Sequence, residues 1–162
     1  MKNELTKEQL EQNPEIARVS AEVLEHMMNP RNYGKMEDSD GIGMGVDKKT
    51  GEFAMVYIRV DDEILSNITF GCNACQDTVV AGSLFTEMVK GDTLENAISA
   101  LKLMSEKILM APKRQQACSN MVLTAFRAAI INRDNKIAGM DEEMCTIDMK
   151  ESCEGVNLNE SL

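Results

Sequence analysis

The sequence predicts an α+β domain in which helices cover one side of a small three-stranded antiparallel sheet. β-forming segments with a period of two occupy the middle of the chain, over residues 53–60 and 64–70. Apolar residues at helical spacing come before these segments and return after them. With 162 residues, 43% of them hydrophobic, the chain is long enough to bury one core without a disulfide or a metal.

Two helices are expected ahead of the sheet. Thr6 and Gln9 form a capping-box pattern for a short first helix. Asn13 followed by Pro14 is typical of the start of a second helix, and the proline after Asn29 ends it. Each helix therefore has its own start signal.

Residues 29–51 contain five glycines and show little periodicity. This pattern indicates a long loop with at most one short edge strand near residues 41–47. The segments 53–60 and 64–70 flank three acidic residues and predict an antiparallel hairpin. The edge strand and the hairpin together make the expected three-stranded sheet.

Further helices are expected behind the hairpin. One starts near Cys75 and ends at Gly91, and Thr93 is the N-cap of the next. A short helical piece over residues 105–110 and a polar loop over 113–117 precede a last helix that begins at Cys118.

Charge divides the chain into residues 1–133, which we expect to form the domain, and an acidic tail over 134–162. The tail holds eight acidic residues and two lysines, in a chain of net charge -10. This acidity argues against nucleic acid as a partner. No apolar run is long enough to span a membrane, and the polar start predicts a cytoplasmic protein with reduced thiols.

An odd count of five cysteines favours metal or sulfur chemistry over a disulfide framework. Cys75 and Cys118 are both expected at helix starts, where the helix dipole favours a thiolate. Cys72 and Cys75 form a CxxC pair, which suits a metal site or a redox disulfide, although Cys72 alone could be a small buried apolar residue. Cys145 and Cys153 are interpreted as incidental.

Several motifs resemble the iron–sulfur cluster scaffold family, which comprises IscU and the N-terminal domain of NifU. Residues 24–34 are similar to its helix end and NPRN-x-G segment, and residues 83–91 to its SLxTExxKG segment. Cys118-Ser119 with the apolar residues 128–130 resembles the last cysteine and helix of the family. The resemblance covers about residues 17–133 and implies the α+β fold already predicted.

The resemblance implies a solvent-facing site of three cysteines and one acidic residue. Cys75 matches the second family cysteine and Cys118 the third, and both become the expected sulfur acceptors. Thr50 stands in place of the first cysteine, Glu52 in place of the family aspartate, and Ala117 in place of a histidine.

A rearranged site is therefore the hypothesis, because a binuclear cluster needs four ligands and prefers thiolates. Cys72 replaces the missing cysteine beside Cys75 and Cys118, and Glu52, Asp77 or an exogenous ligand completes the set. Lys113, at the loop before Cys118, is a possible accessory charge that favours the thiolate or an anionic cluster.

By resemblance, the chain is a non-catalytic scaffold. A cysteine desulfurase delivers sulfur, and iron and a transient [2Fe-2S] cluster are held before transfer to recipient apo iron–sulfur proteins; a homodimer is one option. Two alternatives stay open: a degenerate member that binds zinc, accepts sulfur or regulates without building a cluster, and a CxxC thiol-disulfide protein. The second lacks the βαβ setting of thioredoxin-like motifs.

Overall fold

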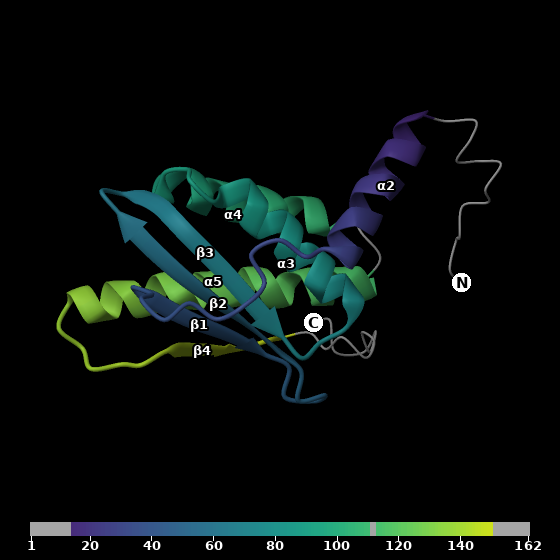
Figure 1. Cartoon of the computed structure of the whole chain (residues 1–162). Coiled ribbons are helices and arrows are strands. Elements are labelled where there is room, and N and C mark those ends of the chain that lie inside the picture. The colour runs from purple at the N-terminus through teal and green to yellow at the C-terminus, as the bar shows by residue number, and fades with distance from the viewer. Residues whose placement is uncertain (1–13, 111–112, 151–162) are drawn as a thin grey trace.

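The computed structural model describes residues 14–110 and 113–150 and has helices packed on a mixed four-stranded sheet (Figure 1). In chain order the elements are α2 (Pro14–Met28), β1 (Gly41–Val46), β2 (Phe53–Asp61), β3 (Ile64–Cys72), α3 (Gln76–Val89), α4 (Leu94–Ile108), α5 (Lys113–Ile137) and β4 (Cys145–Asp148). The α+β class is confirmed. The expected helix at Thr6 and Gln9 lies outside the described residues.

The predicted hairpin is confirmed. β2 and β3 pair antiparallel, and Asp61 faces Ile64 across the turn. Asp62 and Glu63 both have positive φ, 49° and 62°, as a two-residue hairpin turn of type I′ requires. Leu65, two residues after Glu63, lies in the core on the helix side of the sheet.

The strand count differs from the expectation of three antiparallel strands. The sheet order is β3-β2-β1-β4, and β4 runs parallel to β1, so β1 is an interior strand instead of an edge. β4 comes from the acidic segment that we expected to be a tail. It has four residues, of which Cys145 and Ile147 are half-buried. A strand of only four residues has little local signal, and it forms because β1 offers it a backbone partner.

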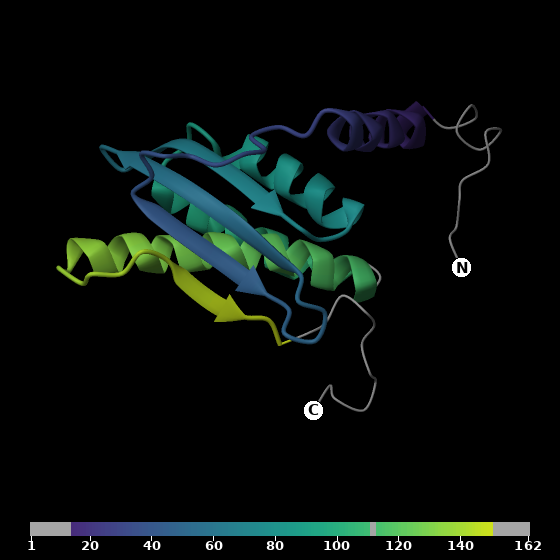
Figure 2. The ribbon, with the colours of Figure 1, turned by 60° about the horizontal axis from the view of Figure 1, so that its bottom comes forward.

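Helices cover one face of the sheet (Figure 2), with α3 and α5 on the sheet and α4 against α5. α5 lies directly on β1, where the alternate residues Gly41, Gly43 and Gly45 face it. A Cβ at Gly43 would collide with the carbonyl oxygen of Ala125 and the amide nitrogen of Ala129. The glycines that suggested a loop therefore allow a helix and a strand to approach backbone to backbone.

Two helix boundaries differ from the prediction. α4 runs without a break from Leu94 to Ile108, where a separate piece from residue 105 was expected. α5 begins at Lys113, so residues 113–117 are helical and the prediction of a loop there is wrong. Lysine, arginine, glutamine and alanine all have good helix propensity. The polar character of residues 113–116 was therefore no evidence for a loop.

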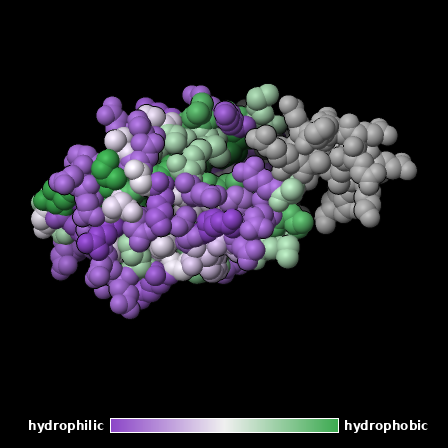
Figure 3. Space-filling view, turned by 45° about the horizontal axis from the view of Figure 1, so that its top comes forward, coloured by the Kyte–Doolittle hydropathy of each residue, from purple (hydrophilic) through white to green (hydrophobic). Residues whose placement is uncertain are grey.

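The surface agrees with the composition. Hydrophilic side chains cover most of the face drawn in Figure 3, with smaller hydrophobic areas between them. Within the described residues, no helix has the length and hydropathy that a membrane crossing requires.

Candidate metal and sulfur site

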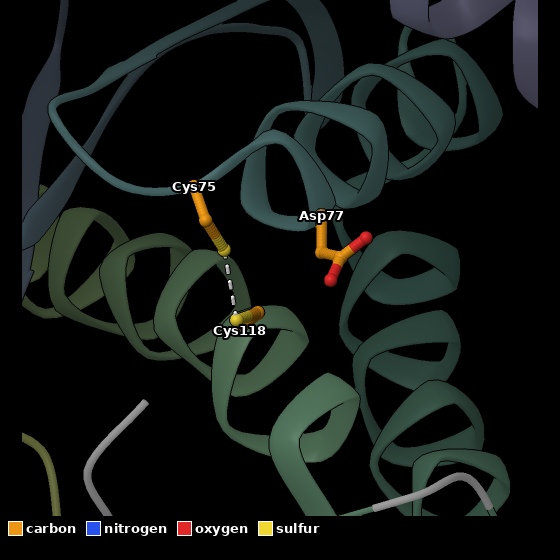
Figure 4. Close-up of side chains that lie close together, drawn as sticks. All are labelled: Cys75, Asp77 and Cys118. Carbon is orange, nitrogen blue, oxygen red and sulfur yellow. Dashed lines mark hydrogen bonds between the residues drawn. The ribbon is translucent and has the colours of Figure 1, made fainter. Parts of the chain in front are cut away.

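The candidate site lies where β3 ends and α3 begins, beside the first turns of α5 (Figure 4). Cys75 is the N-cap of α3, as its position in the sequence predicted. Its Sγ lies 3.1 Å from the Sγ of Cys118, which projects from α5. A carboxylate oxygen of Asp77, in the first turn of α3, lies within 4.8 Å of both sulfurs. The fold thus joins two cysteines 43 positions apart with one carboxylate.

The two thiols have different surroundings. Cys118 is completely buried and Cys75 is half-buried, and neither is in a disulfide. Burial raises the pKa of the Cys75 thiol, but hydrogen bonds to its sulfur outweigh burial and lower the pKa from its ordinary value. The Cys118 thiol contributes most to this lowering, followed by the Thr78 N–H, the Thr78 hydroxyl at 3.7 Å and the Asp77 N–H. Cys75 is therefore the more accessible of the two sulfurs, and its hydrogen bonds favour its thiolate form.

Cys118 does not lie at the start of a helix. It lies five residues inside α5, so the expectation that the N-terminal dipole favours its thiolate is wrong. Lys113 is exposed at the first residue of that helix, more than one turn before the cysteine. Ala117, which stands where the family has a histidine, is fully buried and offers no ligand atom.

Cys72 ends β3 on the same face as the buried Phe70 and packs against the core. Burial raises the pKa of the Cys72 thiol; the Ala74 backbone opposes this, and the charges of Cys75 and Glu52 add to it. Among the described residues, Cys72 and Glu52 fall outside the group whose ligand atoms all lie within 4.8 Å. Their role as ligands therefore stays a prediction.

The turn between β1 and β2 carries Thr50 and Glu52 to the same end of the sheet. Asn73 holds this turn: it accepts the Phe53 N–H at 2.7 Å and donates to the Gly51 carbonyl at 3.4 Å. The Glu52 N–H donates to the Thr50 hydroxyl at 3.1 Å. The sequence analysis missed Asn73, whose partners lie 20 and 22 positions away, and an amide between two cysteines was its only signal.

The two motifs that carried the resemblance contact each other. The Arg31 N–H donates to the Ser83 hydroxyl at 2.7 Å, and Asn32 donates to the Thr86 hydroxyl at 3.1 Å. The buried His26 lies between two side chains of α3, with Nδ1 2.6 Å from the same Ser83 oxygen and Nε2 3.3 Å from a carboxylate oxygen of Glu87. These bonds dock the residues after α2 on α3, the helix that Cys75 caps.

A family model described as the NifU-like N terminal domain matches residues 18–139. The chain belongs to this family. The match includes the candidate site and all of α5, and it ends before β4. The fourth strand of this NifU-like domain thus lies beyond the matched residues.

Named relatives agree with the family. The iron-sulfur cluster assembly scaffold protein IscU 1 of Archaeoglobus fulgidus is 35% identical over 124 residues, which cover 76% of this chain and 81% of that protein. The IscU scaffold protein of Escherichia coli K12 is 31% identical over 121 residues, 72% of this chain and 94% of its own. The NifU-like protein (N-terminal) of Brucella abortus shares the fold, with a TM-score of 0.59 and 19% identity over 71% of this chain and 93% of that one.

The donor set of this NifU-like domain is chemically defined. Two thiol sulfurs and a carboxylate suit iron–sulfur clusters and zinc, because soft thiolate ligands select these metals. The sulfurs already face one another, so a metal would need little rearrangement to bind both. Two sulfurs and one oxygen still leave a four-coordinate metal one ligand short.

Proposed function

We propose that this chain is an iron–sulfur cluster assembly scaffold that takes sulfur from a cysteine desulfurase, binds iron, and passes the assembled cluster to recipient apo proteins. One observation carries the proposal: Cys75 and Cys118 match family cysteines and hold their sulfurs 3.1 Å apart beside the carboxylate of Asp77. Family membership and the scaffold names of the relatives support the general role. The desulfurase, the recipients and the [2Fe-2S] type are parts of the proposal.

The proposed cluster needs one ligand more than the three residues that lie together. A binuclear cluster takes four protein ligands, and Cys75, Asp77 and Cys118 make three. Cys72 is the best fourth ligand, since it ends β3 on the helix side of the sheet. It lies close enough to Cys75 for the charge of the Cys75 thiolate to contribute to raising the pKa of Cys72. Glu52 is the next candidate.

Metal analysis tests the function directly. The protein is isolated without oxygen, incubated with ferrous iron, cysteine and a cysteine desulfurase, and assayed for iron, zinc and acid-labile sulfide. We expect iron and sulfide in equal amounts. Zinc without sulfide would overturn the scaffold in favour of a zinc-binding member, and a metal-free protein with a titratable disulfide would favour a thiol-disulfide protein.

Cysteine variants test the site. Cys75→Ser and Cys118→Ser should each lose most of the bound iron and sulfide, whereas Cys145→Ser should retain them, because Cys145 lies in β4 opposite Gly43, away from the site. Retention in the first two variants would contradict the proposed ligands. The matched control has the same chemical change and a half-buried position like that of Cys75.

A separate experiment tests whether Cys72 replaces the missing first cysteine. If Cys72 replaces the first family cysteine, Cys72→Ser should lower the iron content, and adding Thr50→Cys to that variant should restore it. Asn73 bonds the turn that carries Thr50 to the loop after Cys72, so a thiol at either position belongs to one site. Unchanged iron in Cys72→Ser would remove Cys72 from the ligand set.

A further inference from the structure

The two facing thiols differ in access. Cys118 has 0% of its surface exposed, whereas Cys75 is half-buried at the start of α3. A sulfur donor as large as another protein can reach Cys75 and has no direct route to Cys118. The two Sγ atoms are nevertheless 3.1 Å apart, within the separation of about 3–3.5 Å at which reacting atoms are poised. The accessible sulfur of Cys75 and the buried sulfur of Cys118 are therefore close enough to react with each other.

We infer that Cys75 and Cys118 act as a dithiol that reduces a delivered persulfide sulfur to sulfide within the site. The inference rests on the proposed function, in which a cysteine desulfurase provides the persulfide. It adds an activity to the scaffold: the sulfur leaves the pair as sulfide, the oxidation state that a cluster contains.

The reaction has two exchange steps. In the first, the Cys75 thiolate attacks the terminal sulfur of the donor persulfide; the donor S–S bond breaks, the donor leaves as its thiolate, and Cys75 becomes a persulfide. In the second, the Cys118 sulfur attacks Cys75 Sγ, the bond to the terminal sulfur breaks, and that sulfur leaves with the Cys118 proton as hydrogen sulfide. A Cys75–Cys118 disulfide remains.

Electrons balance across the two steps. The two cysteines lose two electrons on becoming a disulfide, and the donor persulfide gains two on becoming a thiol and a sulfide. A further round needs a dithiol reductant, either a protein dithiol or a small-molecule one, which exchanges with the disulfide and restores both thiols.

The geometry suits the second step. Sulfur exchange proceeds with the attacking, central and leaving sulfurs in line, so the terminal sulfur on Cys75 must lie away from Cys118. Cys118 approaches from the buried side, because it sits on α5 beneath the loop that ends at Cys75 (Figure 4). The leaving sulfide therefore departs on the side of Cys75 opposite the buried Cys118.

A metal-free, single-turnover assay tests the inference. The reduced full chain, treated with a chelator under nitrogen, is mixed with a cysteine desulfurase that carries its persulfide and has been separated from cysteine. Sulfide is measured together with the intact mass and the cysteine-containing peptides. We expect about one sulfide per sulfur transferred, and a chain lighter by two hydrogens with Cys75 linked to Cys118, since one disulfide supplies two electrons.

Variants assign the steps. Cys118→Ser should stop after the first step, with one extra sulfur atom on Cys75 and sulfide no higher than from the desulfurase alone. Cys118→Ala should behave alike, which guards against misfolding from a polar group in the buried position. Cys75→Ser should gain no sulfur, and Cys145→Ser should match the parent chain.

Two outcomes would overturn the inference: a parent chain that keeps a stable Cys75 persulfide without releasing sulfide, or a Cys118 variant that still releases sulfide through a Cys72–Cys75 disulfide. Cluster assembly from ferrous iron and inorganic sulfide bypasses the persulfide. A chain that assembles a cluster this way and fails the release assay overturns the inference alone, whereas failure in both assays also overturns the proposed function.

Discussion

α5 makes two different contacts along its length. In its middle, the backbone near Ala125 and Ala129 lies on Gly43 of β1 so closely that no side chain fits between them. Near its start, the Sγ of Cys118 lies 3.1 Å from the Sγ of Cys75. The first contact is set by close backbone packing over a strand, and the second by a few hydrogen bonds around a loop. One helix therefore serves as a closely packed support for the sheet and as one wall of the candidate site.

Breaking the close packing should have the largest effect. Gly43→Ala places a Cβ against the backbone of Ala125 and Ala129, so we expect a loss of about 3 kcal/mol or more in the free energy of unfolding. Urea denaturation measures the loss. Gly71→Ala is the matched control, because Gly71 is also in a strand and nothing lies within 4 Å of its Cβ position. Equal stability of the two variants would contradict the close approach.

Loosening the site loop should cost less stability and more function. Asn73→Ala removes the acceptor of the Phe53 N–H and the donor to Gly51, and we expect a loss of about 1 kcal/mol in the free energy of unfolding. Iron and sulfide loading should fall more clearly, because the turn with Thr50 and Glu52 is no longer held beside the cysteines. The two readouts are urea denaturation and anaerobic reconstitution. Normal loading would show that Asn73 does not position the site.

A smaller change at the same end of β3 sharpens the comparison. The Tyr33 hydroxyl donates to the Cys72 carbonyl at 3.3 Å, and its ring stands edge-on to Phe70, with 5.3 Å between ring centroids. Tyr33→Phe keeps the ring contact and removes the bond, so we expect a loss of about 0.5 kcal/mol by urea denaturation. Tyr33→Ala, which removes the ring as well, should lose more. If the two variants are equally stable, the ring contact contributes nothing.

The same contrast explains what the sequence could predict. Local signals were sufficient for the hairpin, whose residues alternate around a two-residue turn, and for Cys75, which directly precedes a helical pattern. β4 and the glycine packing were missed because each depends on a partner far along the chain. Within the site, the resemblance placed Cys75 and Cys118 in one ligand set, and their sulfurs lie 3.1 Å apart, but their role as ligands stays a prediction. Asn73 and Thr78 act through hydrogen bonds that only folding creates, and no spacing rule points to them.

The smallest effect is a pH response that leaves the fold intact. Hydrogen bonding holds the pKa of Cys75 below that of an unfolded cysteine, so its contribution to stability is present above the unfolded pKa and is lost as the pH falls through the folded pKa. Burial, followed by the charge of Glu142, raises the pKa of Cys145, whose contribution is present below the unfolded pKa and is lost as the pH rises through the folded one.

Alkylation of the metal-free protein with iodoacetamide, followed by mass spectrometry from neutral to alkaline pH, should therefore show Cys75 reaching half-labelling at a lower pH than Cys145. Midpoints are compared instead of rates, since both thiols are half-buried. Thr78→Val removes the hydroxyl 3.7 Å from Cys75 Sγ and keeps the side-chain shape, so it should move the Cys75 midpoint upward and leave that of Cys145 in place. A Cys145 midpoint below that of Cys75 would mean that the hydrogen bonds at the site do not outweigh burial, and that Cys75 has no advantage as the first sulfur acceptor.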